Sequence, residues 1–271
     1  MKTFRPHGII PPIITPVTDT GRFDESAFQK LIEHLIDNGV HGIFPFGTTG
    51  EFYAFNNDEI KQVLKIAVKA CAGQVPVYAG ANHITTRGAI ELVKIAEDVG
   101  ADAVSVLTPM FISQSQSELY HHYSTIAAST RMPIILYNNK PKTNITIEPE
   151  TVASLALIDN IVGVKDSTGD FTNTAEYIRL TRDMEHFSVL LGRDTLIYAG
   201  LCHGATGAIA ATANVAPGIV VAIYEKFMAG DLAGALEAQF RLAPLRMAAN
   251  MGTFPEAIKE GLRMQGFAVG K

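Results

Sequence analysis

Residues 161–166 read Ile161-Val162-Gly163-Val164-Lys165-Asp166, with four apolar or glycine residues that lead into a lysine. This pattern predicts a short buried strand, with Ile161, Gly163 and Lys165 on one face and Gly163 leaving space beneath the lysine stem. Burial disfavours the charged ammonium, so we expect a lowered pKa and a neutral amine, the nucleophile that forms Schiff bases with carbonyl compounds. The alternative is a lysine that leaves the strand and points into solvent, since perturbed lysines gather at functional sites but not exclusively there.

The segments on either side of this stretch alternate between strand and helix patterns. Three similar joints support the alternation, because each closes a helix with a glycine and then enters a strand. They read Gly39-Val40-His41-Gly42-Ile43, Gly100-Ala101-Asp102-Ala103-Val104 and Gly204-Ala205-Thr206-Gly207-Ala208.

Eight strand patterns separated by helices predict a (β/α)8 TIM barrel of the α/β class, followed by additional C-terminal helices. A doubly wound sheet is the alternative, but no Gly-x-Gly-x-x-Gly fingerprint follows the first predicted strand. We expect residues 1–215 to form the barrel and residues 216–271 to form helices packed on it, as a single structural unit. The predicted strands are 8–15, 42–45, 75–79, 103–107, 134–137, 161–165, 188–191 and 207–210, and the predicted helices are 24–38, 57–72, 85–99, 115–129, 149–158, 173–182, 194–202, 217–228, 232–251 and 255–265.

The composition fits a large folded domain and argues against several classes of protein. Of the 271 residues, 47% are apolar and 18% are charged, so a large core is expected and disorder is not. The net charge is −5 and no basic run stands out, which argues against nucleic acid and membrane surfaces as partners. Residues 1–6 lack an apolar signal core, and no apolar run is long enough to span a membrane. Cys71 and Cys202 both lie in helical patterns, which favours a reducing cytoplasm over a disulfide scaffold.

In such barrels, chemistry gathers where the strands end. After the second predicted strand, Thr48 and Thr49 place two hydroxyls on a glycine-flanked turn, which suits a carboxylate, although a plain Gly-Thr turn is equally compatible. The fifth strand delivers Tyr137, which on its own is more typical of a core residue with its hydroxyl at the rim. The seventh delivers Gly192 and then Asp194, whose simplest role is to cap the next helix.

These motifs together carry a resemblance to a known family. In order and spacing, the chain resembles the dihydrodipicolinate synthase and N-acetylneuraminate lyase family, class I pyruvate-dependent aldolases that are usually homotetramers built as dimers of dimers. The resemblance covers nearly the whole chain. It rests on Gly47-Thr48-Thr49-Gly50-Glu51, Leu136-Tyr137-Asn138 and Gly163-Val164-Lys165-Asp166-Ser167-Thr168-Gly169-Asp170.

The resemblance implies a role for each matching residue. Lys165 would form the Schiff base with pyruvate or another 2-oxo acid, and Tyr137 would carry protons to and from the substrate oxygen. Thr48 and Thr49 would hold the pyruvate carboxylate. The further substrate-binding candidates are Gly192, Ile209, Lys142, Ser167, Thr168 and Asp194.

Two departures from the synthase pattern bear on the second substrate. In synthases the loop after the fourth strand carries paired tyrosines, one of which reaches a neighbouring subunit's site and completes a hydroxyl relay. Here that loop reads Thr108-Pro109-Met110-Phe111, without a phenol. Synthases also place an arginine five residues after the tyrosine, where this chain has Lys142, which keeps the charge but loses the bidentate fork. The run from Lys165 to Asp170 is more like that of the sugar-acid aldolases.

The sequence therefore predicts a Schiff-base lyase that cleaves or condenses a 2-oxo acid, with a 2-oxo-3-deoxy sugar acid as the favoured substrate and pyruvate and an aldehyde as partners. One alternative is 4-hydroxy-tetrahydrodipicolinate synthase, which condenses pyruvate with aspartate semialdehyde. A second alternative is a barrel that binds 2-oxo acids without turnover. No cofactor and no metal are expected, since His121 and His122 are adjacent and cannot share a helix face, and His83 stands alone.

Overall fold

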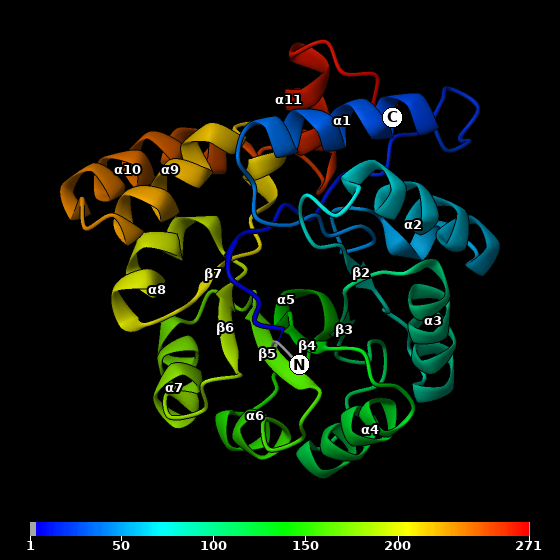
Figure 1. Ribbon diagram of the computed structural model, residues 1–271, viewed down its shortest axis with the longest axis vertical. Helices are drawn as coiled ribbons and strands as arrows, with labels where there is room; N and C mark the ends of the chain where they lie inside the picture. Colours follow the sequence, from blue (N-terminus) through cyan, green and yellow to red (C-terminus); the bar gives the residue numbers. More distant parts are fainter. Residues whose placement is uncertain (1–3, 271) are drawn as a thin grey trace.

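The computed structural model describes residues 4–270 and shows seven parallel strands in one curled sheet surrounded by helices (Figure 1). The strands follow the order β1-β7-β6-β5-β4-β3-β2, so the first strand pairs with the seventh. The predicted alternation of strand and helix is confirmed. The strands are β1 (Gly8–Ile9), β2 (Tyr78–Gly80), β3 (Ala103–Leu107), β4 (Ile134–Asn138), β5 (Ile161–Asp166), β6 (Ser188–Leu191) and β7 (Gly207–Ala208).

The segment 42–45, predicted as the second of eight strands, is not a strand in the structure. It forms isolated parallel bridges, one between Pro12 and Phe44 and one between Ile43 and Val77. The segment thus lies between the chain that follows β1 and the chain that enters β2. Proline has no N–H to donate, so a proline-rich region cannot form a continuous ladder. The prolines that interrupt it here are Pro11, Pro12, Pro45 and Pro76, of which Pro11 and Pro12 also limit the length of β1.

The helices form the outer layer and begin and end close to their predicted limits. Asp24 caps α1 as predicted, since its carboxylate accepts a hydrogen bond from Ala27 N at 3.0 Å. A short helix, α5, was missed because four residues are too few to show a helical period. The helices are α1 (Glu25–Asp37), α2 (Asn57–Cys71), α3 (Thr86–Val99), α4 (Gln116–Ala128), α5 (Lys140–Thr143), α6 (Pro149–Leu155), α7 (Phe171–Thr181), α8 (Ile197–His203), α9 (Pro217–Met228), α10 (Leu232–Ala248) and α11 (Glu256–Met264).

Strand β5 carries Lys165 and departs from a regular pleat. Its register with β4 shifts, so that Ile134 pairs with Ile161 but Ile135 pairs with Gly163. Because of this irregularity, Val162 belongs to the cluster inside the sheet, while Ile161 packs in the outer core, and the prediction that Ile161 shares the face of Lys165 is wrong.

Glycine is required at position 163 for a reason that the sequence did not suggest. A Cβ on Gly163 would lie 2.6 Å from the carbonyl oxygen of Ser188 on β6. The close approach of β6, rather than space beneath the lysine stem, therefore explains the glycine.

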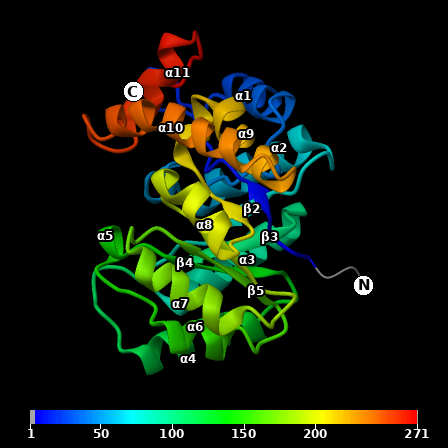
Figure 2. The ribbon, with the colours of Figure 1, turned by 90° about the vertical axis from the view of Figure 1, so that its left-hand side faces the viewer.

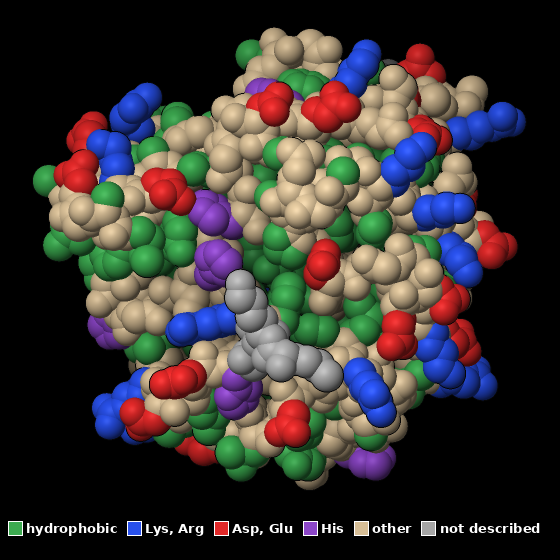
Figure 3. Space-filling view, viewed as in Figure 1, with side chains coloured by type: hydrophobic (Ala, Val, Ile, Leu, Met, Phe, Trp, Pro, Cys, Tyr) green, Lys and Arg blue, Asp and Glu red, His purple; other side chains and the backbone are tan. Residues whose placement is uncertain are grey.

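Helices α9 and α10 lie side by side next to α8 (Figure 2), and α9 contacts β1. Val220 and Ile223 of α9 and Leu242 of α10 share one apolar cluster with Ile9 of β1 and Leu201 of α8. On the face shown in Figure 3, positive and negative side chains are intermingled. Among the described residues, no helix combines the length and apolar character needed to cross a membrane.

Candidate active site

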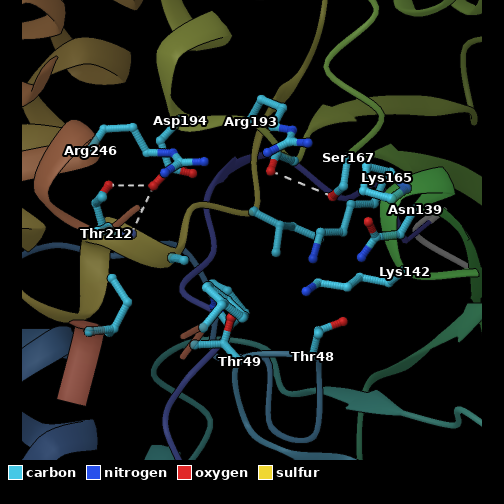
Figure 4. A pocket seen from close by; sticks show the side chains of 18 of the residues that line it. Thr48, Thr49, Asn139, Lys142, Lys165, Ser167, Arg193, Asp194, Thr212 and Arg246 are labelled. Carbon is cyan, nitrogen blue, oxygen red and sulfur yellow. Dashed lines mark hydrogen bonds between the residues drawn. The ribbon is translucent and has the colours of Figure 1, made fainter. Parts of the chain in front are cut away.

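A cavity of about 380 Å³ opens where β4, β5 and β6 end, and side chains from distant parts of the chain line it (Figure 4). Thr168 does not line it: its N–H donates to Asp166 Oδ1 at 3.0 Å and its hydroxyl accepts from Asp170 N at 3.1 Å, so it shapes the turn after β5. The structure brings together all the other predicted site residues, which are Thr48, Thr49, Tyr137, Lys142, Lys165, Ser167, Gly192, Asp194 and Ile209.

Lys165 lies inside the curled sheet, and its side chain is only 3% exposed. Its amine is 3.9 Å from the centre of the Tyr137 ring and 5.1 Å from that of Phe44. Burial lowers the pKa of Lys165 below its ordinary value, although the Tyr137 hydroxyl and the Asp194 carboxylate act in the opposite direction. The lysine predicted to be buried is therefore buried, and it is biased toward the neutral amine that can attack a carbonyl carbon.

Tyr137 lies directly beside Lys165, because the two residues are register partners on β4 and β5. Its hydroxyl is 3.1 Å from Thr48 Oγ1 and accepts a hydrogen bond from Asn139 Nδ2 at 3.0 Å. Burial acts to raise the pKa of Tyr137, but the Lys165 ammonium and the hydrogen bond with Thr48 outweigh it, and the pKa falls below the ordinary value of a phenol. A buried phenol of this kind can give and take a proton near neutral pH more readily than a free tyrosine.

The turn at residues 47–51 presents Thr48 and Thr49 to the cavity. Its backbone is closed by a hydrogen bond from Gly50 N to Gly47 O at 3.1 Å, and Thr15 Oγ1 donates to Gly50 O at 2.9 Å. A Cβ on Gly50 would lie 2.9 Å from Ile13 O, so the turn packs too closely against the chain after β1 to accept a side chain there. These contacts hold the two threonines in place.

A buried ion pair ties the same turn to the end of the chain. Lys259 Nζ, on α11, lies 2.5 Å from Glu51 Oε2, and the lysine side chain is 3% exposed. Glu51 adopts a left-handed backbone conformation with φ of 54°, which is uncommon for a residue with a side chain. The ion pair therefore holds Glu51 at the point where the threonine turn ends.

We expect Glu51→Gln to lower the free energy of unfolding by about 3 kcal/mol, the lower end of the range for breaking a buried ion pair, because solvent reaches part of Glu51. Urea unfolding measures this loss, and Glu260→Gln on the exposed side of α11 is the matched control, with an expected change below about 0.5 kcal/mol. Adding Lys259→Met to Glu51→Gln should recover part of the loss, since no unpaired charge is then buried. Strictly additive losses in the double variant would contradict this account.

Asp194 links the chain after β6 to the chain after β7 by hydrogen bonds and does not cap a helix. Its carboxylate accepts hydrogen bonds from Thr212 N at 2.8 Å and Thr212 Oγ1 at 2.6 Å, as Figure 4 shows, and Gln239 Nε2 donates to its carbonyl oxygen at 2.9 Å. No capping hydrogen bond from the following helix is made, so the prediction of a cap is wrong. The chain after β7 competes more effectively for this carboxylate because Thr212 offers two donors at once.

Basic side chains outnumber acidic ones around the cavity. Lys142 from α5, Arg193 after β6 and Arg246 from α10 all line it, whereas Asp194 is the one carboxylate among the described lining residues. Arg246 donates to Asn250 Oδ1 at 2.6 Å. Arg193 directly follows Gly192, so its position next to a strand end could have identified it as a site residue from the sequence. Nothing in the sequence connects Arg246 of α10 with the site.

The loop after β3 does not complete the cavity within one chain. Phe111 is 92% exposed, has a left-handed backbone with φ of 80°, and does not line the cavity.

Among residues 4–270 no three histidine, cysteine, aspartate or glutamate side chains converge as metal ligands. His122 is buried, and its Nδ1 forms a hydrogen bond with Thr86 Oγ1 at 2.9 Å. Burial lowers the pKa of His122 to about 4. We assign it a structural role.

Comparisons with known proteins agree with this geometry. The sequence profile of the dihydrodipicolinate synthetase family matches residues 5–271. The chain is 39% identical to 4-hydroxy-tetrahydrodipicolinate synthase of Methanothrix thermoacetophila, over 97% of this chain and 88% of that protein. It is similar to the crystal structure of dihydrodipicolinate synthase from Aquifex aeolicus, with a TM-score of 0.93 and 34% identity over 98% of this chain and 90% of that one. It is also similar to a prophage protein of the same family from Escherichia coli K12 in complex with pyruvate, with a TM-score of 0.94 and 32% identity over 97% and 90% of the two chains.

Proposed function

Since this chain belongs to the dihydrodipicolinate synthetase family of class I pyruvate-dependent aldolases, we propose that it condenses pyruvate with aspartate semialdehyde through a Schiff base on Lys165. The observation that carries the proposal is the buried amine of Lys165, 3.9 Å from the ring of Tyr137, in a cavity rimmed by basic side chains. The names of the relatives support this acceptor over the sugar acid that the sequence alone favoured.

The reaction begins when the neutral Lys165 amine attacks the carbonyl carbon of pyruvate. The oxygen takes one proton from the attacking nitrogen and a second from Tyr137, so water leaves and an iminium forms. The iminium withdraws electrons, so the methyl group loses a proton to the Tyr137 phenolate and an enamine results. The enamine carbon then attacks the aldehyde carbon of the second substrate, Tyr137 gives its proton to the aldehyde oxygen, and the iminium forms again. The amino group of aspartate semialdehyde attacks the iminium carbon and displaces the Lys165 amine, and the proton released by the attacking nitrogen returns to the Tyr137 phenolate. Thr48 and Thr49 hold the pyruvate carboxylate, and the amine itself supplies the electron sink, so no cofactor takes part.

The charges around the cavity support an acceptor that carries a carboxylate. Lys142, Arg193 and Arg246 offer cations, and the carboxylate of Asp194 is already engaged by both donors of Thr212. Aspartate semialdehyde brings one carboxylate in addition to that of pyruvate. A 2-oxo-3-deoxy sugar acid remains the second candidate. It is favoured by Ser167, which lines the cavity and whose contact with Gly192 O is long, at 3.5 Å.

Turnover of the two acceptors side by side tests the choice. We expect the rate of condensation with aspartate semialdehyde to exceed cleavage of a 2-oxo-3-deoxy sugar acid. Lys142→Ala should raise the KM for aspartate semialdehyde by about 10–100-fold, because a hydrogen bond between charged groups is lost. Lys142→Arg is the matched control, since it keeps the charge. Efficient cleavage of the sugar acid with slow condensation would overturn the choice of acceptor while leaving the Schiff base intact.

The remaining proposals concern the assembly and the cell compartment. We propose a homotetramer, built as a dimer of dimers, supported by the apolar side chains of Phe111 and Ile112, which are 92% and 64% exposed. A cytoplasmic location is supported by Cys71 and Cys202, both free thiols in this structure.

A barrel that binds 2-oxo acids without turnover is the remaining alternative, and exchange of the pyruvate methyl protons for deuterium would exclude it.

A further inference from the structure

Asn139 makes a contact with the proposed proton carrier that the sequence did not suggest. It lies between β4 and α5, lines the cavity, and is 7% exposed. Its side-chain Nδ2 donates a hydrogen bond to the Tyr137 hydroxyl at 3.0 Å. Thr48 Oγ1 also forms a hydrogen bond with this hydroxyl, at 3.1 Å.

The position of Asn139 makes this contact unexpected. Asn139 is the N-cap of α5, where an asparagine side chain ordinarily accepts a hydrogen bond from the first turn of the helix. Here it makes no capping hydrogen bond, and its amide is directed to Tyr137 instead. The side chain of Asn139 therefore does not stabilise α5 as a cap, and its amide group forms a hydrogen bond in the candidate site instead.

The backbone of Asn139 is held firmly enough for the amide to keep its direction. Its carbonyl oxygen accepts hydrogen bonds from Lys142 N at 2.9 Å and from Thr143 N at 3.1 Å. Thr143 Oγ1 also donates to this oxygen at 3.2 Å, and Thr108 Oγ1 in turn donates to Thr143 Oγ1 at 2.8 Å. The loop after β3 thus supports Asn139 through hydroxyls, although its tip carries Phe111 in place of a phenol.

We infer that Asn139 is a positioning residue that keeps the Tyr137 oxygen as a hydrogen-bond acceptor and so directs the phenolic proton toward Thr48 and the substrate. The inference rests on the proposed function. The nitrogen of an amide side chain can only donate, so the Tyr137 oxygen must accept there and its own proton must point elsewhere. Once the proton has left, the same N–H donates to the phenolate and favours that charged form. Within one chain, Asn139 and Thr48 thereby both orient the Tyr137 hydroxyl.

The sign of the pH effect follows from this geometry. Without the Asn139 donor, the phenolate is less favoured and the pKa of Tyr137 rises. At saturating pyruvate the protein is largely in the Schiff-base form, and exchange of the methyl protons depends on the fraction of Tyr137 that is phenolate. Asn139→Ala should therefore slow exchange at neutral pH by about 10–100-fold and move the acidic limb of its pH profile up by about one to two units. The rate should approach that of the wild type as the pH is raised.

A second readout does not depend on activity. The chain has no tryptophan, so near-ultraviolet difference absorbance reports tyrosine ionisation without interference. Tyr137 has a lowered pKa, whereas burial raises the pKa of Tyr78, Tyr123 and Tyr177. We expect Tyr137 to contribute to the onset of tyrosine ionisation as the pH rises, and this onset should move to higher pH in Asn139→Ala. Asn139→Asp, which keeps the shape but places an anion beside the phenol, should move it further.

The controls separate this role from a structural one. Lys140→Ala changes the neighbouring residue, which does not line the cavity, and should leave both the pH profile and the tyrosine onset in place. If Asn139→Ala slows exchange equally at every pH, and the tyrosine onset does not move in either variant at position 139, the inference is overturned. If the wild type neither traps nor exchanges pyruvate, the proposed function fails, while the tyrosine titration still decides whether Asn139 acts on Tyr137.

Discussion

Replacement of Lys165 by alanine is expected to abolish the capture of pyruvate under borohydride. In the wild type, incubation with pyruvate followed by borohydride should fix one reduced pyruvate per chain on the peptide that contains Lys165. Only an iminium is reduced to a stable amine under these conditions, and the buried amine of Lys165 is biased toward the neutral, nucleophilic form. Turnover should fall to background in the same variant, because every later step of the proposed reaction proceeds from the iminium.

The choice of variants and controls follows from the structure. Lys165→Ala is cleaner than Lys165→Arg, since arginine cannot shed its proton in a buried site. Lys140 is the better internal control, because it is exposed and does not line the cavity, whereas Lys142 does. Peptide mapping by mass spectrometry reads the position of the label. Label on Lys142, or no label on a folded and active protein, would show that the Schiff-base assignment is wrong.

Tyr137→Phe is expected to lower kcat by about 10²–10⁴-fold while pyruvate is still trapped on Lys165. The phenylalanine keeps the ring against Lys165 but removes the hydroxyl that contacts Thr48 and Asn139. Proton transfer is then slowed, whereas the amine that forms the Schiff base remains. The yield of trapping after long incubation, compared with kcat measured by turnover, separates the two effects. An unchanged kcat would leave Tyr137 as a packing residue of the barrel wall.

Much of the fold could be predicted from the sequence, because hydrophobic periodicity and glycine caps mark each helix and most strands. The errors lie where the backbone departs from a regular period. Prolines interrupt the ladder at residues 42–45, where a strand pattern forms only bridges. The shift in register at Ile134 and Ile135 moves Val162 to the inside of the sheet, and no pattern of single residues reveals such an irregularity.

The candidate site was partly predictable for a different reason. Lys165, Tyr137 and the two threonines stand at the ends of strands, and a barrel brings strand ends together whatever the loops do. Asn139 and Arg246 were missed because their roles depend on where a side chain points, not on its place in a motif. Thr168 and Asp194 were assigned to substrate or cap by their residue type, but nearby backbone and hydroxyl groups satisfy them first.

The ion pair between Glu51 and Lys259 has a consequence for folding of the chain during its synthesis on the ribosome. Synthesis proceeds at about 5–20 residues per second, so roughly ten to forty seconds separate the appearance of the two partners. During that interval the threonine turn lacks its ion pair, and for most of it β1 lacks β7 beside it. Nearly all of the candidate-site side chains are therefore synthesised before the ion pair that stabilises the threonine turn can form. Helix α11, which carries Lys259, can stabilise this turn only after it has been synthesised.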